Sequence, residues 1–91
     1  MDGLTATVMD AMSGYAVQGL NGYSVLTASA DHTLLTVVSL ATIKGQRFTT
    51  TSLAVRLLHD MIVIEHDINN KPLVDALLHA GIPRSQIILA Y

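Results

Sequence analysis

The 91-residue sequence contains no cysteine, which excludes disulfide bonds, thiolate nucleophiles and cysteine-ligated metal centres. Basic residues are also scarce, because lysine and arginine together number five and are scattered along the chain. A direct nucleic-acid-binding surface is therefore not expected. No hydrophobic run is long enough to span a membrane, and the first ten residues lack the basic segment of a signal peptide. We expect a cytoplasmic protein without membrane association.

Apolar side chains dominate what is present: 51% of the residues are hydrophobic and only 13% are charged. An average domain carries about 25% charged residues. A chain of this length forms a single domain over residues 1–91, and small domains have much surface relative to their volume. Few charges remain to cover that surface. We therefore expect part of it to be shared with another chain, most simply in a homodimer.

The first expected element is a helix over residues 2–18, with Asp2 as its N-cap. Its apolar positions recur at intervals of three and four, which is typical of a helix with one buried stripe. That stripe consists of Leu4, Val8, Met12 and Tyr15. Gly19 and the Asn21-Gly22 pair end the helix.

Four strands joined by short turns are expected next, which predicts an antiparallel meander. They cover residues 23–30, 33–44, 48–58 and 61–65. The second strand has apolar residues on both faces, so we expect a central strand covered on both sides. In the third strand, Thr49, Thr51 and Leu53 occupy every second position, so we expect their side chains on the same face of the strand. A helix over residues 53–59 is the alternative for that segment.

The last third of the sequence predicts a helix between two strands. Asn69-Asn70 supplies the expected N-cap, and Gly81 is the expected left-handed residue after the helix. Ile82 should pack back on Leu77, and Pro83 prevents continuation. Residues 87–91 are continuously apolar, as in a strand buried on both faces and parallel to another. The fold class is therefore α+β: an N-terminal helix, an antiparallel four-strand meander, a crossover helix and a final buried strand.

Four features together resemble the XisI family, the fdxN-element excision controlling factors of cyanobacteria and some other bacteria. The first helix ends in an aromatic-alanine pair, a long hairpin follows, and a short strand leads to a polar, acidic turn. The crossover helix then has a characteristic ending, here formed by Leu77, Gly81-Ile82-Pro83, Ile87, Leu89, Ala90 and Tyr91. The hairpin is residues 34–43 and 48–57, and the strand and acidic turn are residues 62–67.

The resemblance implies a non-enzymatic accessory protein that acts with a XisH-like nuclease and a recombinase in excision of a DNA element. It implies no catalytic residue and no cofactor. The sequence departs from its relatives in having Leu40-Ala41 where they place a Gly-Trp pair. It also ends at Tyr91, where relatives add a short tail. Any contact made by that tryptophan or tail is not carried over.

The densest cluster of ionisable residues is Glu65, His66 and Asp67, with His59-Asp60 one short strand away. Imidazole and carboxylate groups are metal ligands, so a small metal-dependent hydrolase is the alternative function. A four-residue strand spans roughly 13 Å, however, which is too far for one ion to bridge both ends. A magnesium-dependent nuclease would also need a lysine where Asp67 stands. Two polar turns flanking the strand are the simpler interpretation.

Two further residues are candidates for a polar site or a partner contact. His79 lies near the end of the second helix, where the helix dipole favours a cation. Arg56 interrupts an apolar strand, and we expect it to pair across the sheet with Glu65 or Asp67 or to mark a partner-facing surface. A regulatory domain that encloses a small ligand between sheet and helix is the third functional hypothesis.

Overall fold

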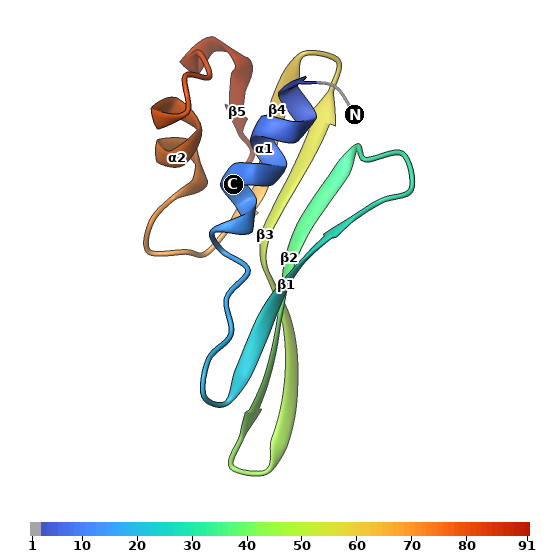
Figure 1. Ribbon diagram of the computed structural model, residues 1–91, viewed down its shortest axis with the longest axis vertical. Helices are drawn as coiled ribbons and strands as arrows, with labels where there is room; N and C mark the ends of the chain where they lie inside the picture. Colours follow the sequence, from blue (N-terminus) through green and yellow to red (C-terminus); the bar gives the residue numbers. More distant parts are fainter. Residues whose placement is uncertain (1–2) are drawn as a thin grey trace.

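The computed structural model describes residues 3–91 and shows two helices against one face of a five-stranded sheet (Figure 1). A short 3₁₀ helix at Arg84–Gln86 precedes the last strand. None of the helices in the described chain is long and apolar enough to cross a membrane. The elements in chain order are α1 (Gly3–Ser13), β1 (Gly22–Ala28), β2 (Leu34–Ile43), β3 (Gln46–Leu58), β4 (Met61–Asp67), α2 (Leu73–His79) and β5 (Ile87–Leu89).

The sheet has the strand order β1-β2-β3-β4-β5, and its first four strands form the predicted antiparallel meander. β5 pairs in parallel with β4 after the α2 crossover, so the sheet is mixed. The predicted α+β fold is thus confirmed. One detail is wrong: β5 is a three-residue edge strand in which only Ile87 is buried, rather than a strand buried on both faces.

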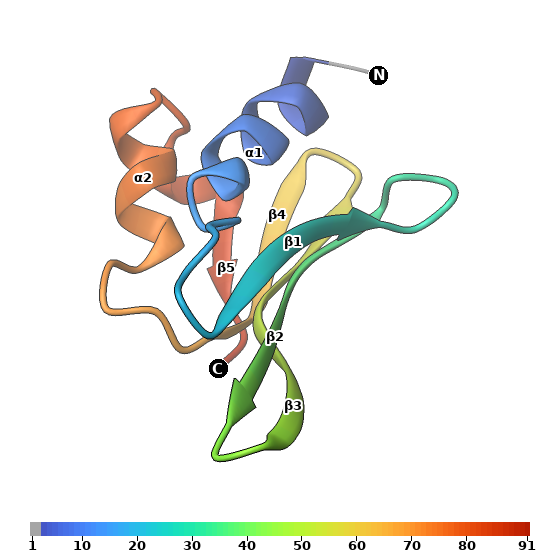
Figure 2. The same cartoon turned by 60° about the horizontal axis from the view of Figure 1, so that its bottom comes forward.

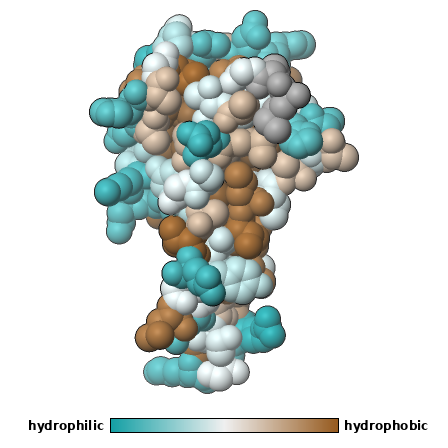
Figure 3. Space-filling view, viewed as in Figure 1, coloured by the Kyte–Doolittle hydropathy of each residue, from teal (hydrophilic) through white to brown (hydrophobic). Residues whose placement is uncertain are grey.

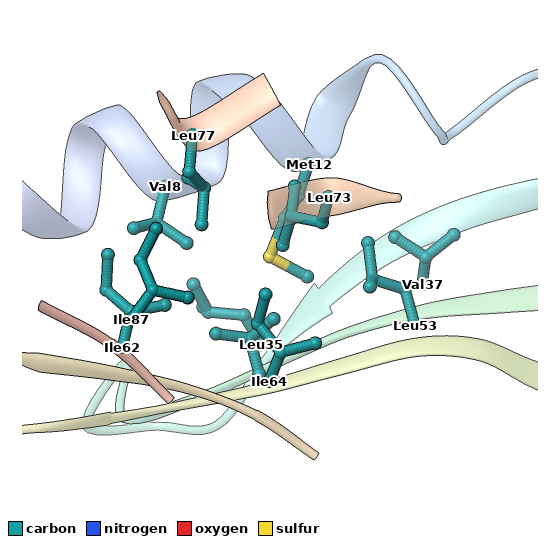
Figure 4. Close-up of a cluster of buried hydrophobic side chains, with 11 residues drawn as sticks. Val8, Met12, Leu35, Val37, Leu53, Ile62, Ile64, Leu73, Leu77 and Ile87 are labelled. Carbon is teal, nitrogen blue, oxygen red and sulfur yellow. The ribbon is translucent and has the colours of Figure 1, made fainter. Parts of the chain in front are cut away.

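The hydrophobic core lies between the two helices and the sheet face that they cover (Figure 4). Val8 and Met12 of α1 point towards the sheet beside Leu73 and Leu77 of α2. All four side chains are fully buried, and burial of each such side chain contributes about 1.5–3 kcal/mol. The sheet's share of the core is Leu35, Val37, Leu53, Val55, Ile62, Ile64 and Ile87.

Helix α1 ends at Ser13, five residues before the predicted boundary. Glycine at position 14 has a low helix propensity, and the amide of Tyr15 already bonds to Met12 in a turn. The predicted stripe is nevertheless correct: Val8 and Met12 are buried, and Leu4 and Tyr15 pack against the core. The predicted N-cap, Asp2, lies outside the described residues.

The opposite face of the sheet carries no helix of the described chain (Figure 1, Figure 2). The prediction that residues 33–44 form a strand covered on both sides is therefore wrong. Leu35 and Val37 of β2 are fully buried beneath the helices, whereas Leu34 on the other face is exposed. Both faces of β2 are apolar, yet this chain covers only one of them.

A β-bulge in β3 reverses the predicted phase of its side chains. Val37 lies opposite Leu53 and Val38 lies opposite Thr51, so Ser52 is an extra residue without a partner in β2. Leu53 therefore faces the core, whereas Thr49 and Thr51 share the uncovered face. The alternative helix over residues 53–59 is likewise wrong, because these residues continue the strand as far as Leu58.

The hairpin formed by β2 and β3 extends beyond the core as an arm (Figure 1, Figure 2). It turns through Lys44 and Gly45, whose φ values of 53° and 79° are those of a two-residue type I′ turn. The molecule is consequently elongated, with dimensions of 44 × 27 × 20 Å. The arm consists of residues 38–51 together with the first half of β1.

Candidate interaction surfaces

Arg56 and Glu65 form the expected cross-strand ion pair, with 2.6 Å between Nε and Oε2. Glu65 is the extra residue of a second bulge, because Val55 lies opposite Ile64 and Ala54 lies opposite His66. The bulge brings the carboxylate to Arg56 on the uncovered face of the sheet. Both side chains remain partly exposed to water, so the pair contributes at most about 1 kcal/mol.

Asp67 has a structural role rather than a place on a surface. Its Oδ2 accepts the backbone N–H of Leu73 at 2.7 Å, and its Oδ1 accepts both the backbone and side-chain amides of Asn69 at 2.9 Å. Asp67 therefore satisfies a free amide of the first turn of α2, whose N-cap position is Pro72 and has no side-chain bond of its own. The predicted capping by Asn69-Asn70 is wrong.

His66 lies at the end of β4 and is exposed. The predicted acidic turn over residues 65–67 is in fact strand, because β4 continues to Asp67. Asp67 is held in the α2 cap and Glu65 pairs with Arg56, so the cluster does not converge on one point. Across the described residues, no three His, Asp or Glu side chains are placed to hold a metal ion together.

His79 is the last residue of α2 and borders an open groove between α1 and α2. Alanines from both helices line this groove, and Asp10 and Asp75 add carboxylates. At one end, the Tyr15 hydroxyl donates to the carbonyl of Lys71 at 2.6 Å. Partial burial, with help from the nearby negative charges of Asp67 and Asp75, raises the pKa of Tyr15 above its usual value of 10.0. The tyrosine thus fixes the loop before α2 against α1.

The five candidate residues are therefore divided among three places. Arg56, Glu65 and His66 lie on or beside the uncovered sheet face, His79 borders the helical groove, and Asp67 caps α2. Core side chains fill the space between sheet and helices, where the third hypothesis places a small ligand. The candidate residues thus do not meet at one site.

The surface that sequence reasoning missed is the uncovered sheet face itself. Strand alternation and register place apolar side chains from four strands on it. Its members are Tyr23 and Val25 of β1, Leu34, Val38 and Leu40 of β2, Val63 of β4 and Ile88 of β5. The signal was present in residues 33–44, which are apolar on both faces, but sequence alone did not show that one face lacks a cover.

The arm carries a second set of exposed apolar residues (Figure 3). In the figure, hydrophobic surface gathers where the body narrows into the arm and along one side of the arm. The large hydrophobic side chains of this second set are Ile43 and Phe48 on the arm and Val17 and Leu20 on the segment that runs beside it, with Leu20 99% exposed. They lie beyond the core, so nothing in the fold itself explains their apolar character.

The total exposed surface agrees with an incompletely covered molecule. The accessible area is 5765 Å² for a chain of 9.7 kDa. A compact monomer of that mass exposes about 5100 Å², roughly 600 Å² less. Each partner in a standard protein interface contributes about 800 Å². One interface of ordinary size would bring this chain close to the exposure of a compact protein.

Comparisons with known proteins give a consistent result. Residues 6–91 match the model of the family described as XisI protein. The crystal structure of the fdxN element excision controlling factor XisI from Anabaena variabilis superimposes with a TM-score of 0.72 at 21% identity, covering 96% of this chain and 88% of that one. A XisI-like protein from the same organism gives 0.73 at 13% identity, covering 96% and 79%. No curated protein sequence matches the chain.

Proposed function

Because the chain belongs to the XisI family, we propose that it is a non-enzymatic accessory protein that regulates excision of a DNA element. In this proposal it works in the cytoplasm by protein–protein contact, and its partner is a XisH-like nuclease. The structurally similar protein from Anabaena variabilis is named as an fdxN element excision controlling factor. The partner supplies the catalysis and the contact with DNA, and this chain supplies a binding surface.

The uncovered sheet face is the observation that carries this proposal. It presents exposed apolar side chains from β1, β2 and β5, namely Tyr23, Leu34 and Ile88, on the same face as the Arg56–Glu65 pair. Large apolar side chains that are exposed together on one face of a small protein mark a surface for contact with another protein. A hydrophobic centre with charged groups at its margin is the usual anatomy of a protein–protein interface.

The basic residues support a role without direct contact to DNA. Arg56 pairs with Glu65, and Arg84 donates to the carbonyl of Ile87 at 2.7 Å. Lys44 and Arg47 lie at the tip of the arm, far along the chain from Lys71. Phosphate binding depends on several cations gathered on one surface, and these five are divided among separate elements.

Co-purification with a XisH-like protein from the same genome tests the proposal. Tagged wild-type chain should retain the partner, whereas Ile88→Lys should lose it, because Ile88 is 45% exposed on the uncovered face. Leu78→Lys is the matched control: Leu78 is 41% exposed but lies on α2, so retention should be unchanged. Equal retention by both variants would show that the sheet face is not the contact surface. No retention by wild type would overturn the proposed partner.

We also propose that the chain is a homodimer. The low charge of the sequence supports a surface shared between two copies, separate from that for the partner. The mass in solution, measured by light scattering during size-exclusion chromatography, should be twice 9.7 kDa at micromolar concentration. A single species at 9.7 kDa would contradict this part of the proposal.

A further inference from the structure

One edge of the arm has an open row of backbone hydrogen-bonding groups. β4 pairs with β3 only from Leu53 onward, so residues 46–51 of β3 have β2 as their sole neighbour in the sheet. All six of these residues are exposed. The open row stops at Ser52, whose carbonyl accepts the Ile68 amide at 3.1 Å and the Asn69 side chain at 3.2 Å. The free edge is therefore short and sharply bounded.

The other edge of the arm is covered by the chain itself. The segment after α1 runs beside the start of β1, where Ser24 donates to the carbonyl of Val17 at 2.7 Å and Gly19 donates to that of Gly22 at 2.8 Å. Gln18 forms a bridge with Tyr23. Edge strands are normally protected by lysine, proline, a bulge or such a cover. In the free row, Arg47 is the one charged residue, and the bulge at Ser52 marks where the row ends. Residues 48–51 between them, which read Phe-Thr-Thr-Thr, have no lysine, proline or cover within the described structure.

We propose that a second copy of this chain pairs with the free edge of β3, antiparallel and about a two-fold axis at Thr49. When two identical strands are related by such an axis, each residue lies opposite a residue of the second copy, and the two side chains point to the same face of the joined sheet. With the axis at Thr49, the two copies of Thr49 lie opposite each other and Phe48 lies opposite Thr50 of the second copy. Arg47 lies opposite Thr51 of the second copy, so the pairing uses only residues 47–51.

The chemistry of these residues fits a like-with-like pairing. Thr–Thr and aromatic–β-branched pairs are both favourable between opposed strands, and this register produces one of the first and two of the second. The two Arg47 side chains lie at opposite ends of the pairing, so they do not repel each other. The helix-covered parts of the two copies also lie at opposite ends of the pairing. The pairing does not use the Ser52 carbonyl, which already accepts hydrogen bonds from residues 68 and 69.

The pairing deepens the proposed homodimer and rests on it, but it does not depend on the proposed nuclease partner. It joins the two sheets edge to edge and leaves free the part of each uncovered face that lies outside the arm. Phe48, which is exposed on the arm, lies opposite the second copy, and this accounts for its apolar character.

Charge substitution at the axis tests the register directly. Thr49→Asp places two carboxylates opposite each other, and Thr49→Lys places two ammonium groups there, so each variant alone should raise the dimer dissociation constant by at least about tenfold. An equimolar mixture of the two variants should restore the dimer as a heterodimer. Thr42→Asp is the control, because Thr42 is exposed on β2 of the same arm but away from the free edge. It should stay dimeric.

A single introduced cysteine gives an independent readout, since the chain has no other thiol. Under mild oxidation Thr49→Cys should form a covalent dimer, and Thr42→Cys should not. A dimeric wild type that is unaffected by either charge at position 49 would overturn the edge pairing but leave the homodimer standing. A monomeric wild type would overturn both. Far-ultraviolet circular dichroism of each variant establishes that the fold is retained.

Discussion

Asp67 shows how a single side chain can look like part of a functional cluster and instead hold the fold together. Its two carboxylate oxygens accept three N–H groups from Asn69 and Leu73. Sequence reasoning searched for an N-cap directly before the helix, as is usual. The true acceptor stands six residues before Leu73 because the intervening loop folds back. That return path depends on tertiary structure and has no local sequence signature.

Replacing this carboxylate should destabilise the protein. Asp67→Ala leaves the Leu73 amide in the first turn of α2 and the Asn69 backbone amide without an acceptor, and we expect a loss of about 2 kcal/mol. Urea unfolding followed by circular dichroism measures this change. His66→Ala is the control, because His66 is exposed beside it and should alter the free energy of unfolding by less than about 0.5 kcal/mol. Equal effects from both substitutions would contradict the capping role.

Asp31 gives a prediction about pH in the loop between β1 and β2. Its Oδ1 accepts the hydroxyls of Ser29 and Thr33 and the amide of Thr33, and these bonds lower the pKa of Asp31 below its usual 3.8. A pKa that is lower in the folded state contributes stability at neutral pH, which is lost as the pH falls below about 4. Carboxyl titration by NMR should show the low pKa. Thr33→Val should raise it, and an unchanged value would contradict the assigned cause.

At the scale of elements, local signals were read correctly and non-local ones were not. The C-terminus of α2 was predicted from Gly81-Ile82-Pro83. Gly81 has a φ of 93°, and the Ile82 amide bonds to the Leu77 carbonyl at 3.0 Å, as in a Schellman motif. The bulge at Ser52 was missed, because its cause is the pairing with β2 and with residues 68 and 69. The local sequence pattern thus predicts whether a segment is helix or strand. Which side chains of a bulged strand face the core depends on the strands beside it.

The close approach of β1 to β2 within the arm gives an element-scale prediction. A Cβ atom at Gly22 would lie 2.2 Å from the carbonyl oxygen of Leu40, so Gly22→Ala must push the two strands apart. We expect a destabilisation of about 1–3 kcal/mol by thermal or urea unfolding. Gly14→Ala is the control, since its Cβ would meet only ordinary contact distances and should change stability by about 0.5 kcal/mol or less. A neutral Gly22→Ala would contradict the described packing.

For the whole molecule, composition indicated a shared surface but not its position. With 51% hydrophobic and 13% charged residues, the chain has more apolar side chains than its small core can bury. The structure divides the surplus between the uncovered sheet face and the arm. The helices cover only one face of the sheet, so β2 has apolar side chains on an exposed face as well. The sequence pattern of such a strand is the same as that of a strand covered on both faces.

Calorimetric titration of a XisH-like protein into the wild-type chain, repeated at several temperatures, tests the proposed function most directly. The proposal predicts saturable binding with a clearly negative heat-capacity change, because the apolar sheet face leaves water on association. Ile88→Lys should abolish the binding and Leu78→Lys should not. Absence of binding at every temperature, or binding with a heat-capacity change near zero that Ile88→Lys leaves intact, would contradict the assignment of the uncovered sheet face as the partner-binding surface.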